Sequence, residues 1–321
     1  MKFWPLIKVL PVRTHFRFVR LARVFATLSV LAIAGSLFLT LYPFKLPCGG
    51  LACGIDFKGG TVMEISTTPR PVDPARVHAA LAGMNLHEIV QPAGATSALL
   101  RFESPAGADI SRTVTEVQAK LTQALGTVRF VSTDVVGPTV SGELLTSGLV
   151  GLGVAILAMM LYIWFRFELQ FGLGAVAALF HDVFLTFGLI AIARIEFNLQ
   201  AVAAILTIIG YSMNDTVVVF DRFRENLRKY KRMPLAEVID MSINEMLTRT
   251  IITSMTAVLA LAALAVFGGP TLYGLSVIML FGIAIGTYSS IYIAAPVIIL
   301  WGVKRGGDDE VAEPLKPQTV R

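Results

Sequence analysis

The sequence predicts a polytopic α-helical membrane protein that carries one α+β domain outside the membrane. Its 321 residues are 55% hydrophobic and only 15% charged, whereas soluble domains contain about 25% charged residues. Several uncharged runs reach the roughly 20 residues that a helix needs to cross a bilayer. Between the first run and the others, residues 45–137 are polar and rich in turns. Together these observations predict one span, then a folded domain, then further spans.

The first span follows a basic tail. Residues 1–23 hold six Lys or Arg residues and no acid, and the uncharged run 24–44 comes directly after them. A cleaved signal peptide is the alternative, since Ala32-Ile33-Ala34 fits an A-x-A cleavage pattern. That triplet lies in the middle of the apolar run instead of after it. We therefore interpret 24–44 as a retained transmembrane helix.

Residues 45–137 alternate between strand and helix patterns. Asp73 followed by Pro74 is typical of a helix start, and Gly126 ends a second helical pattern. The expected elements are strand 61–66, helix 73–84, strands 86–91 and 97–103, helix 109–125 and strand 127–136. This β-α-β-β-α-β order predicts a ferredoxin-like domain.

Residues 138–303 supply five more spans. The expected apolar segments are 144–165, 169–193, 197–220 and the charge-free run 250–303, which Gly-Gly-Pro at 268–270 divides into two helices. Loop 221–248 carries six Lys or Arg residues, and the tail 304–321 begins with two more. Because cytoplasmic flanks are enriched in Lys and Arg, we expect both termini and this loop in the cytoplasm and the α+β domain outside.

A polar stripe crosses the fourth span, and a second one enters the fifth. The first stripe is Thr207, Tyr211, Asn214, Asp215 and Arg222, and the second is Ser242, Glu245, Arg249, Thr253 and Thr256. An intramembrane charge costs roughly 2.5–3.5 kcal/mol, so such residues usually face a partner or a water-filled path. Because the two helices run in opposite directions, Arg249 is expected opposite Asp215. We predict a proton relay; a satisfied structural ion pair is the alternative.

Asp182 lies half-way along the third span and is nearest the midplane by residue counting. We include it in the relay with Asp215, Arg249 and Asn214. His181 is adjacent, but neighbouring helix positions face different directions, which favours a core or interface role for the histidine.

Two further features leave alternatives open. Cys48 and Cys53 have neither a CxxC spacing nor a His-rich neighbour, which argues against a metal site and leaves a short disulfide or two free thiols. Segment 234–247 has an apolar stripe at helical spacing. It lies either along the inner membrane surface or as a loop helix packed on protein.

Four stretches, in this order, carry a family resemblance. They are GIDFKGGT (54–61, with Asp56, Phe57, Gly59 and Gly60), AALFHDV (177–183), GYSMNDTVVVFDRFREN (210–226) and SINEMLTRTIITS (242–254). The chain resembles the smaller subunit of the SecD/SecF family, which assists bacterial Sec protein export and is similar to the resistance-nodulation-division transporters. The family roles in proton transfer map onto Asp215 and Arg249. The chain reads NEMLTRT where the family is expected to read NETLSRT or NQTLSRT.

The resemblance implies an accessory subunit of the bacterial inner membrane that uses the proton motive force late in translocation. Its implied partners are SecD, the SecYEG translocon, an unfolded secreted polypeptide and membrane lipid, with YajC and YidC as further candidates. No cofactor, metal or nucleic acid is expected. Half of a small-molecule or lipid exporter and a purely structural subunit are the alternatives. An enzyme is disfavoured because no GxxxxGK[ST], HExxH or GxSxG motif occurs.

Overall fold

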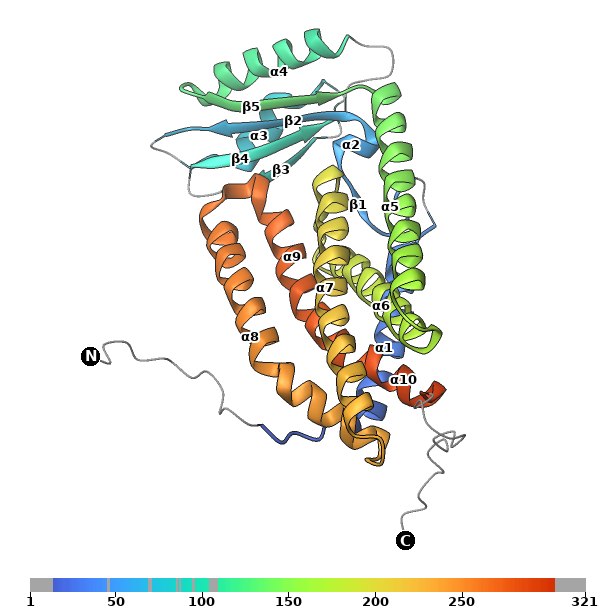
Figure 1. Cartoon of the computed structure of the whole chain (residues 1–321). Helices are drawn as coiled ribbons and strands as arrows, with labels where there is room; N and C mark the ends of the chain where they lie inside the picture. Colours follow the sequence, from blue (N-terminus) through green and yellow to red (C-terminus); the bar gives the residue numbers. More distant parts are fainter. Residues whose placement is uncertain are drawn as a thin grey trace, which may run out of the picture.

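The computed structural model describes residues 14–303 except 45–46, 69–70, 85, 87, 94–95 and 104–108. A helical bundle occupies one part of it, and a small sheet domain (residues 60–136) sits at one end of the bundle (Figure 1). The turn between α7 and α8 lies at the opposite end (Figure 1). The predicted tail residues 1–13 and 304–321 lie outside the described residues.

Six helices in the described chain are long and apolar enough to cross a membrane, as the sequence predicts. They are α1 (Phe18–Leu41), α5 (Pro138–Arg166), α6 (Leu169–Ile192), α7 (Leu199–Lys229), α8 (Leu235–Phe267) and a sixth that combines α9 (Gly269–Ser289), the π-helical η1 (Ser290–Ala294) and α10 (Ala295–Trp301). The predicted break at Gly-Gly-Pro separates α8 from α9. The chain is therefore a multi-span membrane protein.

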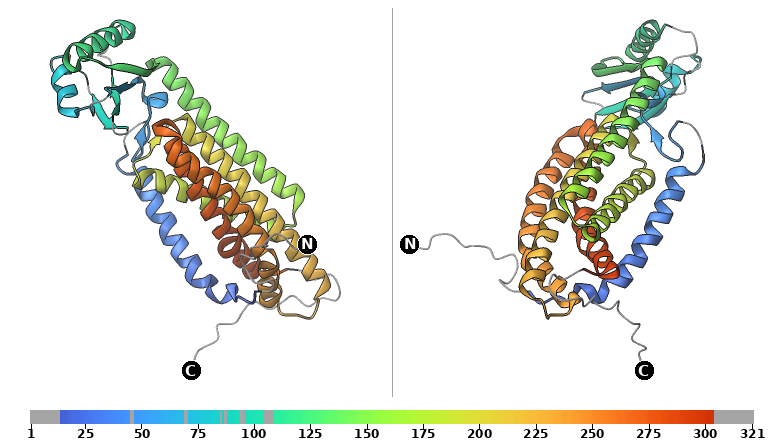
Figure 2. Two further views of the ribbon diagram at one scale, coloured as in Figure 1. Left: turned by 90° about the vertical axis from the view of Figure 1, so that its left-hand side faces the viewer. Right: turned by 45° about the vertical axis from the view of Figure 1, so that its right-hand side comes forward.

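Helices α6 and α7 form the centre of the bundle, since about half of each apolar segment is buried. The largest buried side chains there include Phe171, Phe220 and Phe223. Helices α1, α5 and α8 expose most of their apolar surface and lie on the outside (Figure 2). Such surfaces must face lipid or another protein.

The predicted loop 221–248 is wrong in extent, because α7 continues to Lys229 and α8 begins at Leu235. Ion pairs keep this charged sequence helical: Arg222 binds Glu225 one turn along α7 and Glu245 on α8, each at 2.6 Å. Segment 234–247 forms the first part of α8, and its Ile239 side chain is fully buried. It packs on protein, as one of the two alternatives requires.

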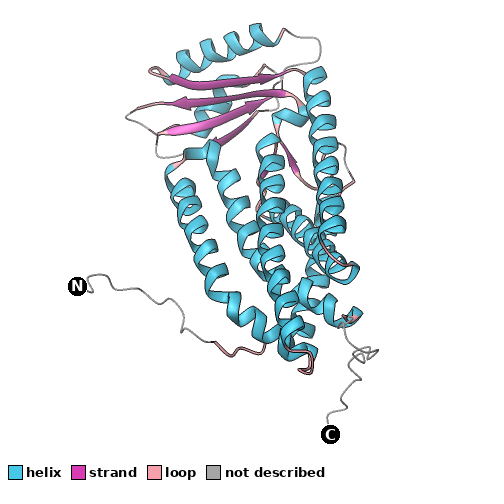
Figure 3. Cartoon of the chain, viewed as in Figure 1, coloured by secondary structure: helices cyan, strands magenta, loops and turns pink. Residues whose placement is uncertain are grey.

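The sheet domain has the predicted β-α-β-β-α-β order (Figure 3). Its elements are β2 (Gly60–Ser66), α3 (Pro74–Leu81), β3 (Ile89–Pro92), β4 (Ser97–Phe102), α4 (Ile110–Leu125) and β5 (Arg129–Val136). The strands are antiparallel in the order β3-β4-β2-β5, with Met63 opposite Leu100. Asp73 and Asp109 cap α3 and α4 by accepting backbone N–H bonds at 3.0 and 2.9 Å.

Three short elements between the sheet domain and the bundle are absent from the sequence-based expectations. They are β1 (Ala52–Cys53), α2 (Ile55–Lys58) and β6 (Glu196–Phe197). Strand β1 pairs in parallel with β6, which immediately precedes α7. Two-residue strands have no periodicity of their own, so only the tertiary structure reveals this pairing.

Candidate functional site

Asp215 lies on α7 between two other helical elements. Thr250 Oγ1 of α8 donates a 2.9 Å hydrogen bond to Asp215 Oδ1, and Ser290 Oγ of η1 donates a 2.8 Å bond to Oδ2. The π-helical turn at η1 positions Ser290, and single π-turns of this kind are frequent at functional sites. Neither hydroxyl residue was among the predicted site residues.

Arg249 does not meet Asp215 in this structure. Its side chain is exposed, and within the described residues it forms no ion pair with the carboxylate. Successive residues of an α-helix point about 100° apart. The side of α8 that presents Thr250 to Asp215 therefore turns Arg249 outward.

Asn214 also points away from Asp215. It is exposed and lines a groove between α5 and α7 together with Ala158 and Tyr162. The adjacent Asn214 and Asp215 therefore lie on different faces of α7, and only Asp215 accepts hydrogen bonds from the hydroxyls of Thr250 and Ser290.

Helices α7 and α8 share three other polar contacts, of which only Arg222–Glu245 joins members of both predicted stripes. The contacts are Tyr211 Oη to Ser254 Oγ at 3.4 Å, Arg222 to Glu245 at 2.6 Å and Asn226 Nδ2 to Ser242 Oγ at 2.9 Å. Thr207, Thr253 and Thr256 instead donate to carbonyl oxygens of their own helices. The seam between α7 and α8 is thus polar near its charged end and around Asp215.

Asp182 forms a second buried carboxylate site, on α6. Its side chain is 1% exposed. Ser212 Oγ of α7 and Ser289 Oγ of α9 donate to Asp182 Oδ2 at 2.5 and 2.8 Å. The Asp182 carboxylate therefore ties three helices together at the centre of the bundle.

His181 belongs to the same network, although adjacent helix positions were expected to diverge. Its Nδ1 lies 2.9 Å from Asp182 Oδ1, and its Nε2 lies 3.1 Å from Ser29 Oγ of α1. Ser29 Oγ also lies 2.8 Å from the hydroxyl of Tyr288. Each ring nitrogen of His181 therefore has a hydrogen-bond partner, a carboxylate oxygen on one side and a hydroxyl on the other.

The GIDFKGGT stretch forms a joint between the sheet domain and α7. Asp56 Oδ2 accepts a 2.9 Å hydrogen bond from the backbone N–H of Leu199, the first residue of α7. Phe57 packs against Phe197 with ring centroids 5.1 Å apart. A carboxylate at a helix N-terminus satisfies an N–H that has no partner within the helix and interacts favourably with the helix dipole.

Gly59 and Gly60 turn the chain from α2 into β2. Their φ angles are +81° and +125°, in the region that favours glycine. A Cβ at Gly60 would lie 3.0 Å from the carbonyl oxygen of Phe102. The two glycines of the motif are therefore explained by backbone geometry.

An ion pair and a disulfide complete the joint. Arg101 of β4 binds Glu196 of β6 at 2.5 Å, and both side chains are largely shielded from solvent. Burial raises the pKa of Glu196 above its usual value, and Arg101 offsets only part of that rise. Cys48 and Cys53 form a disulfide with Cα atoms 5.7 Å apart, so the structure has the bonded alternative.

Comparison with known proteins places this arrangement in a family. Residues 116–304 match the model of the protein export membrane protein SecD/SecF, C-terminal. A protein translocase subunit SecF from Cereibacter sphaeroides is 44% identical over 313 residues, with 94% of each chain covered. The chain belongs to the SecF family. Another SecF, from Rickettsia bellii, is 38% identical and covers 95% of this chain and 99% of its own.

Solved SecDF structures share the fold of this SecF-family chain. SecDF from Thermus thermophilus, described as a translocon-associated membrane protein, superposes with a TM-score of 0.80 and 29% identity over 91% of this chain. A SecDF in a super-membrane-facing form gives a TM-score of 0.60, also at 29% identity, over 92% of this chain. The chain spans only 39% and 40% of the lengths of those SecDF chains.

Proposed function

We propose that this chain is the SecF-type accessory subunit of the Sec export machinery and uses the proton motive force through Asp215. Membership of the SecF family, whose relatives are named translocase subunits, supports the export role. The SecDF chains that share its fold are more than twice as long. We propose SecD as the partner in the membrane, corresponding to the part of those SecDF chains that this chain does not match.

The observation that carries the proton role is the set of hydroxyl donors around Asp215. Thr250 and Ser290 donate to the carboxylate, and no ion pair fixes its charge within the described residues. A hydroxyl group can donate to a carboxylate or accept from a carboxylic acid. The same two partners therefore satisfy Asp215 before and after it binds a proton.

Arg249 would act in another state of the cycle. It is adjacent to Thr250, so a rotation of α8 by about one residue position, roughly 100°, would bring the guanidinium toward Asp215. An arginine beside the carboxylate favours release of its proton. We propose Asp182 as a second buried carboxylate in the pathway, with Asn214 as a polar residue beside Asp215 on the neighbouring face of α7.

The joint offers a route from the membrane to the sheet domain. Leu199 and Asp215 are sixteen residues apart on one helix (215 − 199), a rise of about 24 Å at 1.5 Å per residue. Displacement of α7 at Asp215 would therefore reach Asp56 and β6 at its far end. We propose that this motion moves the sheet domain between states that grip and release an emerging polypeptide.

Orientation follows from the distribution of Lys and Arg. The turn between α7 and α8 is flanked by six basic residues between positions 222 and 232, which favours a cytoplasmic location. The sheet domain then lies on the outer side of the inner membrane. It can meet chains leaving SecYEG there, with YajC and YidC as further neighbours. One proton crossing about 100 mV supplies about 2.3 kcal/mol, enough to bias a change between nearly equal states.

An Asp215→Asn variant tests the proposal. Asparagine keeps an acceptor oxygen for one of the two hydroxyls and presents an amide N–H to the other, but it cannot exchange a proton. We expect normal co-purification with SecD and loss of the proton-dependent part of secretion in membrane vesicles, measured with and without an ionophore. Asp221→Asn on the same helix is the control, because Asp221 pairs at the surface with Arg166. Wild-type secretion in the Asp215 variant would overturn the proton role.

A further inference from the structure

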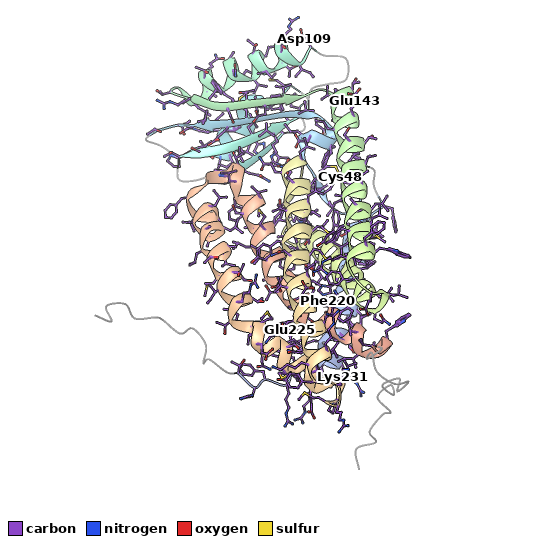
Figure 4. The ribbon with its side chains drawn as sticks, in the orientation of Figure 1. Cys48, Asp109, Glu143, Phe220, Glu225 and Lys231 are labelled. Carbon is purple, nitrogen blue, oxygen red and sulfur yellow. A yellow bond between two sulfur atoms is a disulfide. The ribbon has the colours of Figure 1, made fainter. Side chains whose placement is uncertain are left out.

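A basic cavity opens at the end of α5 and α7 that lies far from the sheet domain. Its volume is about 580 Å³. It is lined by Arg166 of α5 and by Asp221, Arg224, Glu225, Arg228 and Lys229 of α7. Figure 4 places Glu225 in the lower part of the bundle, at the opposite end from Cys48 and Glu143. We refer to this cavity as the basic basin.

The basin carries excess positive charge. Four of its residues are cationic and two are acidic, a net charge of +2 (4 − 2). Asp221 is held by Arg166 at 3.0 Å, and Glu225 is held at 2.6 Å by Arg222, which does not line the basin. Within the described chain, Arg228 and Lys229 form no ion pair. The basin therefore offers Arg228 to an anionic ligand, together with Lys229, whose ammonium also lies 5.1 Å from the centroid of the Tyr230 ring.

An apolar groove continues from the basin along the same two helices. Its volume is about 570 Å³, and its lining includes Ala155, Ala158 and Tyr162 of α5 and Gly210, Asn214 and Val217 of α7. Tyr162 precedes Arg166 by four residues, and Val217 precedes Asp221 by four. Residues four apart share a helix face and are about 6 Å apart along the axis. The groove thus begins one turn deeper than the basin.

The surrounding side chains fix the depth of these cavities. Trp164 and Phe165 are 74% and 85% exposed and directly precede Arg166. Exposed aromatic side chains beside basic residues are typical of the boundary between lipid headgroups and hydrocarbon. The basin therefore lies at headgroup level, and the groove lies within the hydrocarbon layer.

We propose that the basin and groove form one binding site for an anionic phospholipid. The phosphate lies in the basin beside Arg228 and Lys229, and an acyl chain occupies the groove. Small residues create the space: a Cβ added at Gly210 would meet no atom within 4 Å. An anionic amphiphile matches both parts of the site. Its negatively charged group fits the basin, and the hydrocarbon chain attached to that group fits the adjoining groove. This site is separate from Asp215 and does not depend on the proton role.

The charge half of the site is tested by native mass spectrometry of the full chain in detergent with added phosphatidylglycerol or phosphatidylethanolamine. The wild type should retain phosphatidylglycerol preferentially. An Arg228→Gln/Lys229→Gln variant should bind it on the order of twentyfold more weakly, since each juxtamembrane cation contributes about a fivefold factor. Arg20→Gln/Arg23→Gln is the matched control, because these exposed residues lie at the same end on α1 but outside the basin. Equal losses in the two variants would overturn the site.

The groove half is tested with Gly210→Leu and Ala158→Leu, which leave every charge in place. Both should weaken phosphatidylglycerol binding while leaving the melting temperature in lipid-free detergent near the wild-type value. If lipid binding is unchanged in these variants and inorganic phosphate competes effectively, the basin alone binds the phosphate group. That outcome would overturn the proposal. A photo-crosslinker at position 158 provides a second arm. Crosslinks to a partner helix, with no phospholipid retained by the purified complex, would also overturn it.

Discussion

Thr250 donates a 2.9 Å hydrogen bond to Asp215, while Arg249, the preceding residue on α8, is turned to the surface. One step along the helix thus separates a neutral partner from a cationic one. We propose that the rotation of α8 decides which of them the carboxylate meets.

Replacing Thr250 by valine should impair proton-dependent secretion, and replacing it by serine should not. Valine keeps the shape but removes the hydroxyl, which leaves Asp215 short of one buried hydrogen bond at a cost of about 1–3 kcal/mol. Secretion from vesicles under an imposed proton gradient measures the effect. Thr253→Val is the control, since Thr253 bonds only its own helix. Similar activity in the valine and serine variants at position 250 would contradict the role of the hydroxyl.

Asp56→Ala should loosen the start of α7. The substitution removes an N-terminal hydrogen bond and a favourable charge, together worth about 0.5–2 kcal/mol. We expect faster amide hydrogen exchange around Leu199, with less change near Asp215. Asp109→Ala is the control, because Asp109 caps α4 in the same way and its loss should affect only the sheet domain. Unchanged exchange in α7 would refute the connection.

The burial of Glu196 should make the stability of the folded chain depend on pH. Because burial raises the pKa of Glu196, the folded chain retains a proton that the unfolded chain has already lost. Stability should fall as pH rises from the ordinary glutamate pKa through the raised value and then level off. Glu196→Gln should remove this contribution to the change of stability with pH. Melting temperatures between about pH 4 and pH 8 would measure it.

Glu103→Gln is the control for the pH experiment, because Glu103 pairs with Lys58 at the surface, where both side chains are substantially exposed. Surface pairs of this kind contribute little to stability. If the pH dependence of the melting temperature persists unchanged in Glu196→Gln, Glu196 is not its source. The same conclusion follows if the pH dependence disappears equally in both variants.

Gly188→Ala and Gly282→Ala should destabilise the bundle. An added Cβ at Gly188 would lie 2.1 Å from Ser36 Oγ, and one at Gly282 would lie 2.3 Å from the Ile208 side chain. Overpacking of this kind costs about 1–3 kcal/mol. Gly153→Ala, which meets no atom within 4 Å, should melt at or above the wild-type temperature. Thermal unfolding in detergent distinguishes them, and equal melting temperatures would contradict the close packing.

The sequence by itself determined the six spans and the order of elements in the sheet domain. Long uncharged runs have one stable arrangement in lipid, the helix, because every backbone polar group must be satisfied internally. Local signals at Asp73 and Gly126 likewise act within one turn of chain. The ends of α7 and α8 were missed because Arg222 and its partners sustain the helices beyond the apolar run.

Only the tertiary structure decided which side chains meet. Asp215 was identifiable as an unusual charge, but Thr250, Ser290 and the exposure of Arg249 depend on the rotation of α8 and on the π-turn at η1. The bond from Leu199 to Asp56 joins residues 143 positions apart. Contacts of this range depend on how whole helices pack against each other, and no local pattern along the chain records that packing.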